Sequence, residues 1–194
     1  MIKIAIFASG FGTNASNIIT YFKDNLDICV SGIYTDNPDA KVISLAIANN
    51  ISFFLFSKED LNNPAIVLDD LQKNGINFII LAGFLRLIPN FILKNFQNRI
   101  INIHPSLLPA YGGQGMFGDN VHRAVLANAE KQSGITIHYV SEKYDEGAII
   151  LQKTCLVFST DTVNSLAKRV HTLEYDYYPT TIESLCNDLL SSLK

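Results

Sequence analysis

The sequence predicts an α/β fold: a single-domain, open, mostly parallel twisted sheet with helices on both faces, followed by a C-terminal β-hairpin and helices. Short, almost continuously apolar runs recur along the chain, as in strands that are buried on both faces. Segments with the apolar spacing of helices alternate with these runs. The chain has 194 residues, of which 48% are hydrophobic and 17% charged. We therefore expect one domain, residues 1–194, around one core.

The first half of the chain reads as alternating strands and helices. Apolar runs predict strands at 2–8, 28–34, 51–56 and 78–82. Helical spacing predicts helices at 14–23, 40–49 and 61–74, the last interrupted near Pro64. A fifth strand begins at Ile100 and closes with Asn102 and His104.

The second half begins with a glycine-rich loop and ends in helices. Residues 110–120 form the loop, whose length is typical of lids and binding loops, and His122 then opens or precedes a helix as a structural or surface residue. Residues 134–140 and 148–156 are predicted to pair as a hairpin joined by 141–147. The last helix is expected to run through Tyr178, to break at Pro179, and to be followed by a second helix to Leu193.

Composition favours a small-molecule partner. The net charge is -3 and no Lys/Arg cluster is present, which argues against a nucleic-acid surface. The three cysteines lie far apart without C-x-x-C spacing, so neither a disulfide framework nor a metal site is expected. The apolar opening is too short for a secretion signal and no run reaches membrane-spanning length. A cytoplasmic protein without a membrane partner is the expectation.

The clearest chemical signal is the pair Asn102 and His104 at the end of the fifth strand. Residues two apart on a strand share one face, so the two polar side chains lie side by side. An amide and a protonated imidazole suit an oxygen that gains negative charge when a nucleophile adds to a carbonyl. The alternative is that both side chains merely satisfy backbone groups at the end of a strand.

A second signal is the turn Ser9-Gly10-Phe11-Gly12-Thr13-Asn14 between the first strand and the first helix. Free amides at a helix N-terminus, approached through glycines, form an anion site. The loop also fits the dinucleotide pattern G-x-G-x-x-A, with Asp36 where a ribose-binding acid would stand. A tight turn that binds nothing is the third interpretation.

A third segment, residues 83–88, leaves the carboxyl end of the fourth strand, where open α/β sheets bind ligands. An apolar loop with one arginine could form the wall of a site for a flat heteroaromatic ring. Arg86 alternatively serves only as a solvated or helix-bridging charge.

Three motifs together resemble the folate-dependent formyltransferases: N-I-H-P-S-L-L-P at 102–109, L-A-G-F-L-R at 81–86 and Y-D-E-G at 144–147. The resemblance covers nearly the whole chain and implies the Rossmann-like fold of that family. It implies transfer of the formyl group of 10-formyltetrahydrofolate, a co-substrate, to the amine of phosphoribosylglycinamide in purine biosynthesis. No metal is implied, and the protein is expected to be a monomer or homodimer. Relatives that act on methionyl-tRNA or hydrolyse the formyl folate are expected to carry a further domain, for which this chain has no room.

The resemblance also implies roles for particular residues. Catalysis falls to Asn102 and His104, with Asp145 assisting proton transfer. The ribose phosphate of the amine substrate is expected at Gly12, Thr13, Asn14, Pro105, His171 and Glu174. The folate is expected at Leu85, Arg86, Leu87, Ile88, Asn102, Ser141, Glu142, Lys143, Tyr144 and Asp145.

Five further positions need comment. Glu146 is expected to point to solvent, and His138 is interpreted as structural. Some relatives place an arginine near the folate tail, but residues 57–72 contain none, and Lys58 is the nearest cation. Taken without the resemblance, His171 and Glu174 would only be an exposed helix face.

Overall fold

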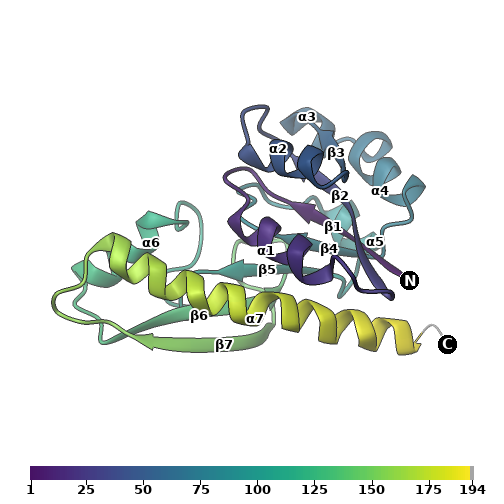
Figure 1. The fold of residues 1–194 in the computed structure, drawn as a ribbon. Helices are drawn as coiled ribbons and strands as arrows, with labels where there is room; N and C mark the ends of the chain where they lie inside the picture. Colours follow the sequence, from purple (N-terminus) through teal and green to yellow (C-terminus); the bar gives the residue numbers. More distant parts are fainter. Residues whose placement is uncertain (193–194) are drawn as a thin grey trace.

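One seven-stranded sheet organises the protein, whose computed structural model describes residues 1–192 (Figure 1). The strand order is β3-β2-β1-β4-β5-β6-β7, in which β1 to β5 are parallel and β6 and β7 antiparallel. The strands are β1 Ile2–Phe7, β2 Ile28–Thr35, β3 Ser52–Leu55, β4 Phe78–Leu81, β5 Ile100–His104, β6 Gln132–Tyr139 and β7 Ile149–Leu156. The predicted mostly parallel sheet with a C-terminal hairpin is confirmed.

Helices cover both faces of this sheet because successive residues of the buried strands are apolar, so that both faces of each strand are apolar. Ile4 and Ile6 of β1 belong to one core cluster, whereas Ala5 and Phe7 belong to the other. The first cluster packs under α1 Thr13–Phe22, α2 Lys41–Ala48, α6 Asp119–Ala127 and α7 Val163–Ser192. The second packs under α3 Lys58–Leu61, the π-helical turn η1 Pro64–Leu68, α4 Asp69–Lys73 and α5 Asn90–Asn95.

The order of the strands places a crevice beside β1. The chain runs outward from β1 through β2 to β3, and β4 then pairs with the opposite edge of β1. Such a switch of direction separates the loops that leave the carboxyl ends of the two central strands, which is where open α/β sheets bind ligands. The glycine-rich turn leaves β1 there, residues 82–88 leave β4, and Asn102 and His104 end the adjacent β5.

Helix α7 contradicts the prediction of a break at Pro179, because it continues through this proline to Ser192. A proline in a helix leaves the carbonyl four residues earlier without its N–H donor. Here that carbonyl belongs to Tyr175, and it accepts a hydrogen bond from Asn17 Nδ2 of α1 at 2.9 Å. A neighbouring helix thus replaces the lost donor. The predicted end of the second helix at Leu193 lies outside the described residues.

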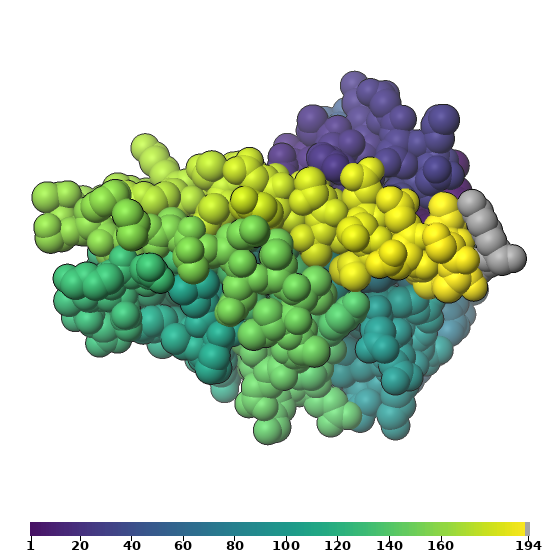
Figure 2. Space-filling view, turned by 90° about the horizontal axis from the view of Figure 1, so that it is seen from below, coloured from purple at the N-terminus to yellow at the C-terminus, as the bar shows by residue number. Residues whose placement is uncertain are grey.

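The same helix is anchored to the centre of the sheet. The buried hydroxyl of Tyr178 donates to the carbonyl of Leu81 in β4 at 2.8 Å and lies 3.3 Å from that of Ile101 in β5. Figure 2 shows α7 extended across the surface between the N-terminal elements and the β7 region. The residues one turn before Tyr178 are therefore held at the ends of the central strands.

Some element boundaries differ from those predicted. The helix expected at 61–74 begins earlier, at Lys58, behind a capping box formed by Ser57 and Asp60, and divides into α3, η1 and α4. Helix α5 was not predicted, and β6 begins at Gln132. Within residues 1–192, no helix is long and apolar enough to cross a membrane.

Candidate active site

A single cavity of about 1090 Å³ occupies the crevice at the carboxyl ends of β1, β4 and β5. It is lined by the glycine-rich turn after β1, the loop after β4, the end of β5, the 113–120 loop and α7. Of the predicted site residues, those that line it are Gly12, Thr13, Asn14, Leu85, Arg86, Leu87, Ile88, Asn102, His104, Pro105, Ser141, Lys143, Tyr144, Asp145, His171 and Glu174. The structure thus brings together segments that are far apart in the sequence.

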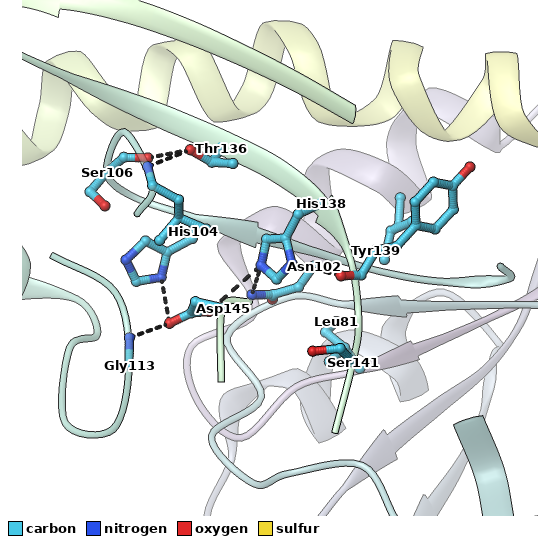
Figure 3. A network of polar contacts seen from close by, with 12 residues as sticks. Leu81, Asn102, His104, Ser106, Gly113, Thr136, His138, Tyr139, Ser141 and Asp145 are labelled. Carbon is cyan, nitrogen blue, oxygen red and sulfur yellow. Dashed lines mark hydrogen bonds and ion pairs between the residues drawn. The ribbon is translucent and has the colours of Figure 1, made fainter. Parts of the chain in front are cut away.

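Asn102 is oriented by His138, which faces it across the β5–β6 pair (Figure 3). Nδ1 of His138 lies 2.8 Å from the carbonyl of Tyr139, so this nitrogen carries the proton. In a neutral ring, Nε2 is then free to accept a hydrogen bond from Asn102 Nδ2, at 3.2 Å. One amide N–H of Asn102 is thereby engaged, and the other remains for a ligand.

Asp145 lies between two histidines. Its Oδ2 is 3.5 Å from His104 Nδ1 and its Oδ1 is 3.6 Å from His138 Nε2, while the Gly113 amide donates to Oδ2 at 2.8 Å (Figure 3). The carboxylate is delivered by a tight turn in which Asp145 itself has a φ of 56°. Gly147 completes this turn, since a Cβ there would lie 1.6 Å from the Tyr139 carbonyl oxygen.

The charge state of this cluster reflects burial and its neighbours. Burial alone would raise the pKa of Asp145, but His138, His104 and the Gly113 amide together hold it below its usual value. Burial lowers the pKa of His104, and the opposing effects of Asp145 and the Tyr111 carbonyl do not reverse the shift. The free protein therefore favours an ionised Asp145 and a neutral His104, which differs from the protonated His104 expected from sequence.

His104 has a defined tautomer in this arrangement. Its Nε2 lies 2.7 Å from the Tyr111 carbonyl, to which it donates, so Nδ1 carries the lone pair of the neutral ring and faces Asp145. A proton accepted at Nδ1 would lie between imidazole and carboxylate. Nδ1 is thus the position at which the neutral ring can take up a proton.

The segment after β5 is held by a buried threonine. Thr136 Oγ1 donates to the Ser106 carbonyl at 2.7 Å and accepts from the Leu108 amide at 3.0 Å. Gln152 Nε2 of β7 lies 2.9 Å from both Thr136 Oγ1 and the Leu108 carbonyl. These contacts fix the exit of the strand that carries His104.

The glycine-rich turn leaves the N-terminus of α1 open. Gly12 has a φ of 75°, and a Cβ there would lie 2.9 Å from Val42 of α2, so both backbone shape and space require glycine. No side chain caps α1 and its first turn contains no acidic residue. Its first amides are therefore free to bind an anion in the cavity.

Glu174 and His171 of α7 face this turn across the cavity. Asn14 Nδ2 donates to Glu174 Oε2 at 2.9 Å, joining α1 to α7. Burial raises the pKa of Glu174, while Asn14 and His171 act in the opposite direction. Glu174 is 5% exposed, so the pair is part of the cavity wall and not the exposed helix face that the pattern alone would suggest.

Asp36 does not stand free as a dinucleotide site would require. Its Oδ1 accepts from Ser9 Oγ at 2.6 Å, and its Oδ2 is paired with Arg86 Nε. Both carboxylate oxygens are thus engaged by the turn after β1 and the loop after β4. Arg86 is therefore paired with Asp36 and does not bridge helices, although its side chain is 38% exposed.

Other named positions lie as follows. Of the residues assigned to the folate, Glu142 does not line the cavity and is exposed on the turn, and Lys58, the nearest cation in residues 57–72, begins α3 outside the cavity. His122 is 1% exposed inside α6, so it is not a surface residue. His138 is buried and contacts Asn102, and it lies on the same face of β6 as Thr136. Glu146 is exposed as predicted and pairs with Lys143 at 3.1 Å.

Comparisons with known proteins identify the family of the chain. The family described as formyl transferase matches residues 2–182. Phosphoribosylglycinamide formyltransferase of Bacillus subtilis (strain 168) is 39% identical over 190 residues, covering 95% of both chains. The chloroplastic enzymes of that name from Arabidopsis thaliana and Vigna unguiculata are each 39% identical, and the chain spans 66% and 61% of their respective lengths.

Solved structures show the same fold. The glycinamide ribonucleotide transformylase 1 of Geobacillus kaustophilus superposes with a TM-score of 0.86 at 34% identity, over 96% of this chain and 99% of the other. That of Symbiobacterium toebii gives a TM-score of 0.87 at 32% identity, over 97% and 89%. With a family match across nearly all of its length and the same fold in these relatives, the chain belongs to the formyl transferase family.

Proposed function

We propose that the protein transfers the formyl group of 10-formyltetrahydrofolate to the amine of phosphoribosylglycinamide, producing formylglycinamide ribonucleotide and tetrahydrofolate. The observation that carries the proposal is that Asn102, His104 and Asp145 open into one cavity with an uncapped helix N-terminus and an apolar loop. The cavity, of about 1090 Å³, is slightly larger than the range of ~300–1,000 Å³ for ligand sites and has room for two substrates.

The amine substrate is assigned to the side of the cavity formed by α1 and α7. The free amides of Gly12, Thr13 and Asn14 suit its phosphate, because helix N-termini favour anions. Glu174 is a buried acceptor for ribose hydroxyls, and His171 lines the cavity one turn before it. Pro105 follows His104 directly and lines the cavity, so it is assigned to the same side.

The folate is assigned to the loop after β4 and the turn that carries Asp145. Leu85 and Leu87 are 45% and 41% exposed, so their apolar side chains are available to pack against the ring of the folate. Tyr144 Oη lies 3.4 Å from the Leu85 carbonyl across this part of the cavity. Ser141 and Lys143 form the outer wall, where the polar tail would lie.

One proton transfer can prepare both partners for reaction. The amine arrives as an ammonium ion and must lose a proton before its nitrogen can attack the formyl carbon. His104 Nδ1, stabilised by Asp145, accepts that proton, and the positive charge of the ring then stabilises the negative oxygen of the tetrahedral intermediate. Asn102 donates a hydrogen bond to that oxygen from its unengaged N–H. Collapse breaks the bond to the folate nitrogen, which takes up the proton that the attacking nitrogen loses.

The test is an absorbance assay of folate deformylation with and without phosphoribosylglycinamide. We expect turnover only when the amine is present, with formylated product appearing in equal amount. Turnover that ignores the amine would overturn the proposal and make the protein a hydrolase.

A dinucleotide-binding function is the second candidate, supported by the G-x-G-x-x-A pattern of the turn after β1. It is disfavoured because both oxygens of Asp36 are already engaged. Titration with NADH, followed by its fluorescence, should give no saturable change.

A further inference from the structure

His122 is a buried polar side chain to which none of the roles above assigns a partner. It lies in the nine-residue helix α6, is 1% exposed, and lines the same cavity as His104 and Glu174. Its Nδ1 is sealed from solvent and has no hydrogen-bond partner among the described residues. The ring nitrogen that a molecule in the cavity can reach is therefore Nε2.

A second unpartnered atom lies in the same wall. Asn14 Oδ1 is also sealed and without a partner within residues 1–192, although Asn14 Nδ2 is bonded to Glu174. Because both atoms are sealed, neither can contact a ligand in the cavity; the part of His122 that can is Nε2, a polar group of a buried side chain that still needs a hydrogen-bond partner. The two residues reach the cavity from different helices, α6 and α1.

The protonation of His122 decides what it can offer. Burial lowers its pKa, and the nearby charges of His171 and His104 act in the same direction, against Asp119. The ring is thus neutral and carries one N–H. An orphaned N–H is rarer in proteins than an orphaned acceptor. We therefore place the lone pair on the sealed Nδ1 and the proton on Nε2, which makes His122 a donor to the cavity.

The position of the ring identifies the part of the ligand that it meets. His122 lines the cavity together with His171, at the proposed ribose side, and His104, at the formyl centre. The charges of both histidines act on its pKa, as expected for a ring beside what connects the two sides. In the amine substrate, that connection is the sugar and the glycinamide linkage.

We propose that His122 is a specificity-determining residue that donates a hydrogen bond from Nε2–H to a neutral oxygen of the sugar–amide segment of the amine substrate. The inference rests on the proposed function and extends it to a residue outside the three motifs. It assigns to α6, which follows the glycine-rich loop, a direct part in recognising the amine substrate.

Three variants separate a donor at Nε2 from a role in folding. His122→Gln can place an amide N–H near the position of Nε2, His122→Asn places its amide near Nδ1, and His122→Leu removes both. With hydrogen bonds of ordinary strength, His122→Asn and His122→Leu should raise the KM for phosphoribosylglycinamide by about 3- to 10-fold. His122→Gln should stay within about twofold of wild type, and the KM for 10-formyltetrahydrofolate should not change.

Calorimetric titration of each variant with phosphoribosylglycinamide, without folate, gives a readout that is independent of turnover. The dissociation constants should follow the same order as the KM values. Unchanged binding in His122→Leu would overturn the inference, as would equal weakening in all three variants with equal losses of thermal stability, which would indicate a structural role. Failure of the proposed function would be seen separately, as wild-type turnover that does not depend on the amine.

Discussion

His104 is the residue on which the proposed chemistry depends most directly. His104→Asn would remove the proton acceptor beside Asp145 and the positive charge that forms on it. Because that interaction is made mainly in the transition state, kcat should fall by about 10²-fold or more, while both KM values change little. Steady-state kinetics with each substrate varied in turn measures this, and an unchanged kcat would return His104 to a structural role.

Asp145 and Glu146 are adjacent carboxylates with different surroundings. Asp145 contacts two histidines and a backbone amide, whereas Glu146 is exposed beside Lys143. Asp145→Asn should therefore cut kcat by about 10²-fold or more, the range of general-base losses, without unfolding the protein. Glu146→Gln is the matched control and should remain near wild type. The reverse ranking would move the catalytic role to Glu146.

Acid should destabilise the protein through its buried histidines. Burial holds the pKa values of His104 and His122 below their ordinary value of 6.5, so the unfolded chain binds more protons than the folded one below about pH 6.5. The free energy of unfolding should thus fall as pH decreases below 6.5, at up to about 1.4 kcal/mol per histidine for each pH unit. The lowered pKa of Asp145 adds a further loss only below its ordinary value of 3.8.

Urea unfolding of wild type and His122→Gln at pH 7.5 and 5.5 checks this expectation. The variant lacks one of the two titrating groups, so its stability should change less between the two pH values. An equal change in both proteins would mean that His122 titrates alike in the folded and unfolded chains.

At the scale of elements, α7 is continuous because Asn17 replaces the donor that Pro179 lacks. Asn17→Ala should lower the free energy of unfolding by roughly 0.5–1.5 kcal/mol, the usual contribution of one hydrogen bond. In a Pro179→Ala background the restored amide can bond to Tyr175, so the same substitution should cost less. Denaturation of the two single variants and the double variant measures the coupling, and simple additivity would contradict this explanation.

The continuity of α7 also shows why the local sequence pattern wrongly predicted a break at Pro179. Sequence could identify the helical spacing on both sides of Pro179, but the compensating donor is in α1, far away along the chain. The partners of His138 could not be predicted for a related reason, because they come from β5 and from the turn after β6. By contrast, the strands, the glycine-rich turn and the Asn102–His104 face were predictable, since each is specified by neighbouring residues. The burial that lowers the pKa of His104 depends on tertiary packing and could not be read from one strand.

At the scale of the whole molecule, Asp36 joins the two halves of the cavity. It bonds to Ser9 in the turn assigned to the amine substrate and to Arg86 in the loop assigned to the folate. Asp36→Asn removes the negative charge that holds the turn after β1 and the loop after β4 in position. We expect the KM of each substrate to rise several-fold, with a smaller change in kcat, because positioning is lost and not the reacting groups.

Asp39→Asn is the matched control, since Asp39 is exposed beyond the end of β2 and should leave both KM values unchanged. A rise in only one KM for Asp36→Asn would show that the two loops are positioned independently. Thermal unfolding of the variant verifies that the fold is retained.

The bond between Asn14 and Glu174 joins residues 160 positions apart, which has a consequence for synthesis of the chain. Contacts between distant residues are slow to form, and a ribosome releases the N-terminal partner long before the C-terminal one. Strands β1, β4 and β5 can emerge and pair in that order while α7 is still untranslated. A growing chain therefore has Asn102 and His104 before it has the wall to which the sugar is assigned, and the complete cavity forms only after most of the protein has been made.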